Sequence, residues 1–248
     1  MKKFKLSYLP WLTLAAGILG FILQVVLHLT GTDEKGLLIP GHIAGIGLYV
    51  LMALVLGGLF FTLRHLHPMS RYSKLFPAST TAFIGCVLAA AGIIIGGIKS
   101  YPQQHDKIAM VGVILALAAG ICLVLIGLCR KNGRQPNYLL HCCVTVYLML
   151  QLVSLYRHWS PEPQLLVYFF PLMAAVFLML TAYHAACLDG GKGSRQWYVF
   201  FNLSAVFFCC VSLAGEFWLF YLSMGLWAFT NLCSLNPGKS RPAEIKEA

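Results

Sequence analysis

Charged side chains are scarce in this chain. Only 10% of its 248 residues are Asp, Glu, Lys or Arg, whereas about 25% of the residues in an average soluble domain are charged. Hydrophobic residues make up 59% of the sequence. No segment between the apolar stretches reaches the roughly 50 residues that a folded soluble domain needs. This composition excludes an ordinary soluble enzyme and favours one integral membrane domain.

Several chemical motifs are also missing. The nine cysteines contain no C-x-x-C pair, so neither a disulfide framework nor a zinc ribbon is indicated. The chain has no H-E-x-x-H, G-x-S-x-G or G-x-G-x-x-G motif. No Lys, Arg, Asp or Glu lies near the middle of an apolar stretch, which argues against a retinal Schiff base and against an ion-coupled pump. These absences favour a protein that is not an enzyme.

The sequence consists mostly of long apolar stretches. Each is close to the length of about 20 residues that a helix needs to cross a bilayer, and none alternates as a barrel strand would. We predict an all-α fold, a single polytopic domain over residues 1–248, with eight transmembrane helices arranged as four hairpins. The predicted spans are 10–29, 37–63, 78–98, 107–129, 137–159, 164–187, 196–213 and 217–234.

Positive charge falls almost entirely on one side of these spans. If the N-terminus is cytoplasmic, 14 of the 18 Lys and Arg residues lie in inner segments, and only Lys35, Lys99, Lys107 and Arg157 lie in outer loops. Cytoplasmic loops of membrane proteins carry such an excess. We therefore expect a cytoplasmic-membrane protein with both termini in the cytoplasm.

The net charge of +10 follows from the distribution of basic residues across the membrane. The basic residues are spread over five inner segments, so we do not expect a nucleic-acid partner. We expect the lipid bilayer itself, and anionic inner-leaflet lipids at the basic loops. A membrane or cytoplasmic partner protein stays open as a further partner.

Individual residues predict details of the helices. Pro171 is expected to kink the sixth helix, and Trp159 to belong to an interfacial aromatic belt. Small residues spaced four apart in the second, third and fourth helices predict that these three helices pack tightly together, with dimerisation through one of these faces as the alternative. Glu216 is interpreted as a partner for the helix dipole at the start of the eighth helix.

Neutral polar residues supply a candidate substrate cavity. Tyr147 and Gln151 share one face of the fifth helix, and Asn231 lies on a polar face of the eighth. Gln24 and Asn202 add single amides. The three residues Tyr147, Gln151 and Asn231 predict either a polar-lined cavity or hydrogen bonds between helices in a closed bundle.

Histidines form two pairs at similar depth. His28 and His42 lie at outer helix ends, and His141 and His184 lie at inner ends. Each pair lies on adjacent antiparallel helices, as the axial ligands of membrane b-type cytochromes do. These four residues are therefore candidates for binding haem or a metal, with structural roles at the membrane interface as the alternative.

Three segments resemble a known group of proteins. They are Thr32–His42, Tyr156–Gln164 and Tyr183–Ala186. They are similar to uncharacterised polytopic membrane proteins of Clostridia-like bacteria, and the resemblance covers most of the chain. It implies a bacterial cytoplasmic membrane and no particular activity.

The leading hypothesis is a non-enzymatic, permease-like protein or membrane subunit that handles a small neutral or lipophilic molecule and needs no cofactor. Two alternatives stay open. The first is a haem- or metal-binding redox protein, and the second is a membrane sensor or assembly scaffold.

Overall fold

The computed structural model describes residues 8–31, 39, 41–64, 75–100, 107–161 and 168–235. These residues contain no strand, so the predicted all-α class is confirmed for them. They form eight α-helices and one short 3-10 helix: α1 (Leu9–Thr30), α2 (Ile43–Leu63), α4 (Thr80–Ser100), α5 (Lys107–Lys131), α6 (Tyr138–Trp159), α7 (Phe169–Asp189), α8 (Arg195–Val211), η3 (Ser212–Ala214) and α9 (Trp218–Cys233).

The start of α2 lies later than the predicted residue 37. Gly41 has a φ of 83°, a left-handed conformation that interrupts a helix and favours glycine. His42 then caps α2, because its Nδ1 accepts the backbone N–H of Ala44 at 3.3 Å. The apolar run therefore begins before the helix does, and residues 37, 38 and 40 lie outside the described part of the chain.

The predicted kink at Pro171 is wrong. Helix α7 begins at Phe169, so Pro171 lies in its first turn. Backbone N–H groups there have no partner within the helix, and a proline removes nothing by lacking one. The Pro171 carbonyl instead accepts a hydrogen bond from the hydroxyl of Tyr221 on α9, at 3.1 Å.

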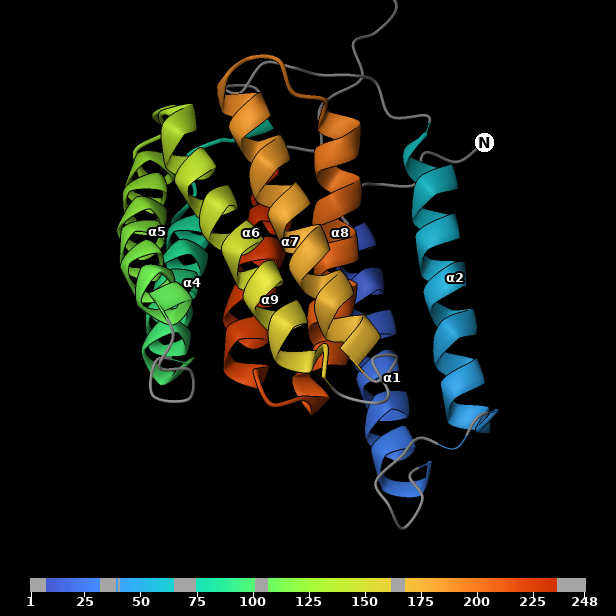
Figure 1. Ribbon diagram of the computed structural model, residues 1–248. Coiled ribbons are helices and arrows are strands. Elements are labelled where there is room, and N and C mark those ends of the chain that lie inside the picture. The colour runs from blue at the N-terminus through green and yellow to red at the C-terminus, as the bar shows by residue number, and fades with distance from the viewer. Residues whose placement is uncertain are drawn as a thin grey trace, which may run out of the picture.

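Six helices close into a ring, and two more pack on its outside (Figure 1). Each helix from α4 to α8 contacts the next along the chain, and α9 closes this six-helix ring by contacting both α8 and α4. Outside the ring, α1 lies against α8, and α2 packs mainly on α1. Because α5 also packs on α6, and α7 on α8, the contacts do not single out four hairpins, which stay a prediction.

The two ends of the bundle differ in which residues they hold. Helices α4, α6 and α8 start at the end that contains His141, which is at the top of Figure 1, and we name it the His141 end. The opposite end contains the turn from η3 to α9, and we name it the Glu216 end. The described chain begins and finishes at the His141 end, because α1 starts there and α9 finishes there.

The predicted packing of small residues holds for two of the three helices. A Cβ atom on Gly97 of α4 would lie 2.8 Å from the Cβ of Ala116 of α5, and one on Gly120 would lie 2.8 Å from the Cδ1 of Ile94. Helices α4 and α5 thus pack closely. The prediction is wrong for α2, which packs on α1 and α8 instead.

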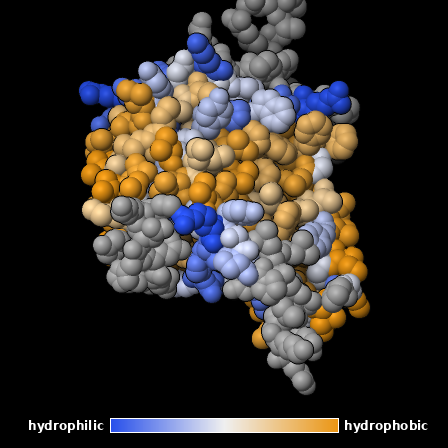
Figure 2. All heavy atoms as spheres, viewed as in Figure 1, coloured by the Kyte–Doolittle hydropathy of each residue, from blue (hydrophilic) through white to orange (hydrophobic). Residues whose placement is uncertain are grey.

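An apolar belt crosses the face of the molecule seen in Figure 2, between more polar residues at both ends. Seven described helices are long and apolar enough to cross a membrane. Large apolar side chains on their outer faces, such as Leu54, Ile114 and Met149, are exposed, which a soluble monomer rarely tolerates over such an area. The chain is therefore a multi-pass membrane protein.

Helix α9 is the exception in length. Its 16 residues span about 24 Å at a rise of 1.5 Å per residue, which is less than the roughly 30 Å hydrocarbon core of a bilayer. Within the ring it contacts α4 and α8. Its residues Trp227 and Tyr221 are almost completely buried, so protein surrounds much of α9.

Candidate functional site

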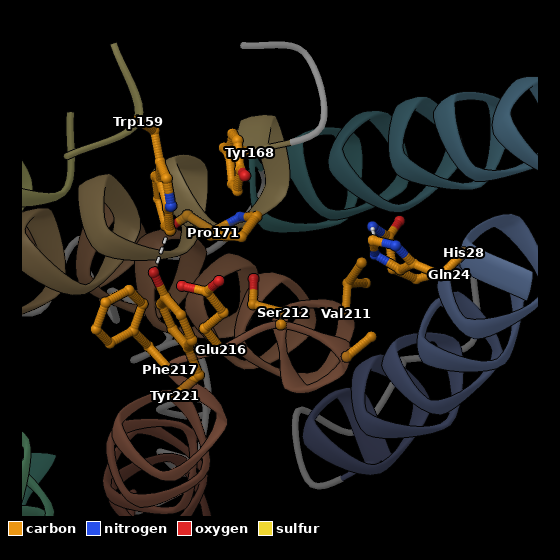
Figure 3. A pocket seen from close by; sticks show the side chains of 12 residues that line it. Gln24, His28, Trp159, Tyr168, Pro171, Val211, Ser212, Glu216, Phe217 and Tyr221 are labelled. Atoms are coloured by element: carbon orange, nitrogen blue, oxygen red, sulfur yellow. Dashed lines mark hydrogen bonds between the residues drawn. The ribbon is translucent and has the colours of Figure 1, made fainter. Parts of the chain in front are cut away.

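A cavity of about 200 Å³ lies at the Glu216 end, between α1 and the six-helix ring. Its wall comes from α1, the end of α6, the start of α7, the end of α8 and the turn from η3 into α9 (Figure 3). Pockets that bind drug-sized molecules usually enclose about 300–1,000 Å³. This Glu216 cavity therefore suits a smaller molecule.

One wall of the cavity is aromatic. The rings of Trp159 and Tyr168 stack with their centroids 4.5 Å apart and an angle of 11° between the planes. The ring of Phe217 meets that of Trp159 at 5.9 Å and 66°. Pro171 and Tyr221 continue this wall. Such a surface favours the apolar body of a ligand.

Two hydroxyl groups in the cavity wall donate their hydrogens to backbone carbonyls. The Oγ of Ser212 donates to the carbonyl of Phe208 at 2.7 Å, and the hydroxyl of Tyr221 donates to the carbonyl of Pro171 at 3.1 Å. A hydroxyl has one hydrogen and two lone pairs. Both groups can therefore act only as acceptors toward a ligand.

Two buried polar atoms of the cavity wall have no partner among the described residues. Gln24 is 6% exposed and Trp159 is 3% exposed. The amide nitrogen of Gln24 donates to His28 Nε2 at 3.2 Å, but Gln24 Oε1 and Trp159 Nε1 make no hydrogen bond. Leaving such an atom unsatisfied costs about 1–3 kcal/mol. A bound molecule or a water would relieve this cost.

Glu216 lies at the mouth of the cavity and is exposed. In Figure 3 its carboxylate and the hydroxyl of Ser212 lie on one side of the cavity, and Gln24 and His28 face them from α1. From the sequence, Glu216 is expected only to act as a partner for the helix dipole. The structure adds a place in the wall of a cavity, which could not be seen without knowing that α1 packs beside α8.

The three residues of the predicted cavity do not line the Glu216 cavity. Tyr147 and Asn231 are buried, and Gln151 is partly buried. Gln151 lies beyond the middle of α6, whereas Asn231 lies in the last turn of α9, near the His141 end. The two amides are thus at different depths. A cavity around these three residues stays a prediction.

His28 and His42 lie at the Glu216 end, as the spans predict, but have different partners. His28 accepts a hydrogen bond from Gln24 and borders the cavity. His42 caps α2, and its Nε2 lies 3.5 Å from the Oγ1 of Thr30. The structure gives each imidazole a role that needs no metal, and joint haem ligation stays a prediction.

His141 and His184 also have different partners. The Nδ1–H of His141 donates to the Oδ2 of Asp189 at 2.5 Å, and both side chains are buried. The amide of Gln135 donates to the backbone carbonyl of the same aspartate. His184 instead stacks on Phe201 of α8, with the centroids 4.9 Å apart. Among the described residues no three His, Cys, Asp or Glu side chains are grouped to hold a metal ion.

Buried polar and aromatic groups also fill the His141 end of the ring. The Arg130 guanidinium lies 3.6 Å from the centroid of the Phe76 ring, and the Phe76 ring meets that of Tyr198 edge-on at 5.6 Å. Arg130, Asp189 and Arg195 are each less than 8% exposed. Arg130, Phe76 and Tyr198 therefore pack against one another at the His141 end, whereas the Glu216 end holds the cavity.

The burial of Asp189 cannot be predicted from the sequence, because the glycines that follow it are typical of a solvated turn. The cavity-lining roles of Trp159 and Glu216 cannot be predicted from it either. A lone amide such as Gln24 on an otherwise apolar helix is the one sequence signal that points to the cavity.

Comparison of the chain with protein-family models, with curated proteins and with solved structures finds no match.

Proposed function

We propose that this multi-pass membrane protein binds a small molecule in the Glu216 cavity, and that it works as a permease-like protein or as a ligand-binding membrane subunit. The observation that carries the proposal is that two buried atoms without a partner among the described residues, Gln24 Oε1 and Trp159 Nε1, lie in the wall of a preformed cavity, whereas others, such as the amide atoms of Asn202, do not. Buried polar atoms of folded proteins nearly always have partners. A ligand that forms hydrogen bonds with both atoms would provide the missing partners.

We propose further that the ligand enters from outside the cell. The excess of Lys and Arg in the segments at the His141 end favours a cytoplasmic location for that end. The cavity then opens on the outer side. The packing of Arg130, Phe76 and Tyr198 at the other end supports a state that is closed toward the cytoplasm.

Replacing Gln24 by Leu should weaken ligand retention. The variant removes the unpartnered Oε1 and puts an apolar side chain of similar size in its place. We expect about tenfold less bound small molecule, from the loss of one hydrogen bond. The measurement is native mass spectrometry of the full chain, of mass 27.3 kDa, extracted in mild detergent. The wild-type protein should carry a stoichiometric small-molecule adduct.

Gln151→Leu is the matched control, because it removes a partly buried amide that lies outside the cavity. This variant should keep the adduct. Equal loss of the adduct in both variants, or a wild-type spectrum that contains only bare chain and lipid, would refute binding in the Glu216 cavity.

Cysteine labelling tests the orientation. Ser160 lies at the Glu216 end and Asn132 at the His141 end, and both are exposed. In intact cells a membrane-impermeant maleimide should label Ser160→Cys but not Asn132→Cys, with the wild-type chain as the background for its nine native cysteines. Labelling of Asn132→Cys alone would place the cavity on the cytoplasmic side.

A further inference from the structure

We infer that the ligand of the Glu216 cavity is a small ammonium ion that carries an apolar group, an inference that rests on the proposed binding in this cavity. The sequence alone favours a neutral or lipophilic molecule. The inventory of hydrogen-bond donors, acceptors and charges in the cavity wall points to a cation instead.

Acceptors predominate in the part of the wall that Gln24, Ser212, Glu216 and Tyr221 form. Ser212 and Tyr221 have donated their hydrogens to backbone carbonyls and keep only lone pairs. Gln24 Oε1 has no partner among the described residues and is an acceptor only. Glu216 adds a carboxylate with two acceptor oxygens. A primary ammonium, which brings three N–H donors and no acceptor, complements this set.

Charge favours the same class of ligand. Glu216 is acidic, and the imidazole of His28 is the one basic side chain among the described residues that line the cavity, which include no Lys or Arg. A hydrogen bond from an ammonium to a carboxylate is roughly twice as strong as one between neutral groups. A carboxylate ligand would instead be repelled by Glu216. The wall therefore selects for a positive ligand and against a negative one.

The rest of the cavity accommodates an apolar group. The aromatic wall of Trp159, Tyr168 and Phe217 lies beside the carboxylate of Glu216 (Figure 3). Aromatic rings bury apolar surface and also attract a nearby cation through their negative faces. Trp159 Nε1 is a donor, so a ligand oxygen next to the ammonium group would satisfy it as well.

The test uses three probes that share one ring and differ in the polar end: benzylamine, benzyl alcohol and benzoate. Their dissociation constants are measured by isothermal titration calorimetry on the full-length protein in mild detergent. We expect benzylamine to bind at least about tenfold tighter than benzyl alcohol, as the exchange of a neutral hydrogen bond for a charged one predicts, and benzoate to bind most weakly.

Variants at Glu216 assign the preference to its charge. Glu216→Gln keeps the size of the side chain and should lower the affinity for benzylamine about tenfold, while the affinity for benzyl alcohol stays nearly unchanged. Glu216→Asp keeps the charge and should retain the preference for the amine. Because Glu216 is exposed, neither variant should impair folding.

The inference is overturned if benzylamine does not bind, if either other probe binds as tightly, or if Glu216→Gln leaves the preference intact. Failure of the ammonium inference and failure of the proposed function are distinguishable. In the first case the wild-type chain still retains a small-molecule adduct that Gln24→Leu loses, and in the second it retains none.

Discussion

Replacing His141 by Leu should lower the free energy of unfolding by about 3–5 kcal/mol, because removal of one partner leaves the carboxyl group of Asp189 buried without its hydrogen-bond donor. The His141 and Asp189 side chains are 2% and 1% exposed. Asp189 is also the last residue of α7, where the negative end of the helix dipole opposes a carboxylate. The loss should be measured by titrating the full-length protein in mild detergent with a denaturing detergent.

Two further variants show whether the hydrogen bond between His141 and Asp189 is the cause. His184→Leu, at the same end of the bundle, removes a ring that stacks on Phe201 and should cost only about 0.5–1.5 kcal/mol. The double variant His141→Leu with Asp189→Leu should recover much of the stability, since an apolar pair can replace a buried polar pair at little cost. If His141→Leu costs no more than His184→Leu, the pair does not stabilise the fold.

The positions of the helices could be predicted from the sequence because the signal is local. A run of apolar residues in lipid must satisfy its own backbone hydrogen bonds, so it becomes a helix. The errors arose where the apolar run and the helix do not coincide. Gly41 and His42 begin α2 after the run has started, and Pro171 belongs to the first turn of α7 and not to its interior.

The candidate site could not be predicted, because it depends on which helix faces meet. Gln24 and Tyr221 line one cavity although they are far apart in sequence. Trp159 was predicted to be an interfacial residue, but it is only 3% exposed, because Tyr168 and Phe217 cover it. Hydropathy gives the depth of a side chain in the membrane and not the direction in which it points.

The α1 side of the cavity depends on how closely α1 approaches α8. A Cβ atom on Gly20 would lie 2.7 Å from the Cγ2 of Val211, which lines the cavity, and one on Gly17 would lie 2.8 Å from the Cβ of Cys210. These two glycines let α1 lie flat against the ring. They thereby place Gln24, about one turn further along α1, within the cavity wall.

The contact between α4 and α9 depends on glycine in the same way, and Gly92→Val is the sharpest test of the closed ring. A Cβ atom on Gly92 would overlap the Oγ and Cβ of Ser223, and one on Gly85 would overlap the Thr230 hydroxyl. Since these atoms lie next to the α9 backbone, the helices must separate, at a cost of about 3 kcal/mol or more in the free energy of unfolding.

Two comparisons isolate the effect of this contact, with stability measured by the same denaturing-detergent titration. Gly96→Val places the same side chain one turn further along α4, where no atom of the described residues, apart from the helix's own backbone, lies within 4 Å of the added Cβ, and should change stability by less than about 1 kcal/mol. Gly92→Val combined with Ser223→Gly removes the colliding side chain and should recover stability. If Gly92→Val is as stable as Gly96→Val, α9 does not close the ring against α4. Helices other than α4 would then bury the short α9.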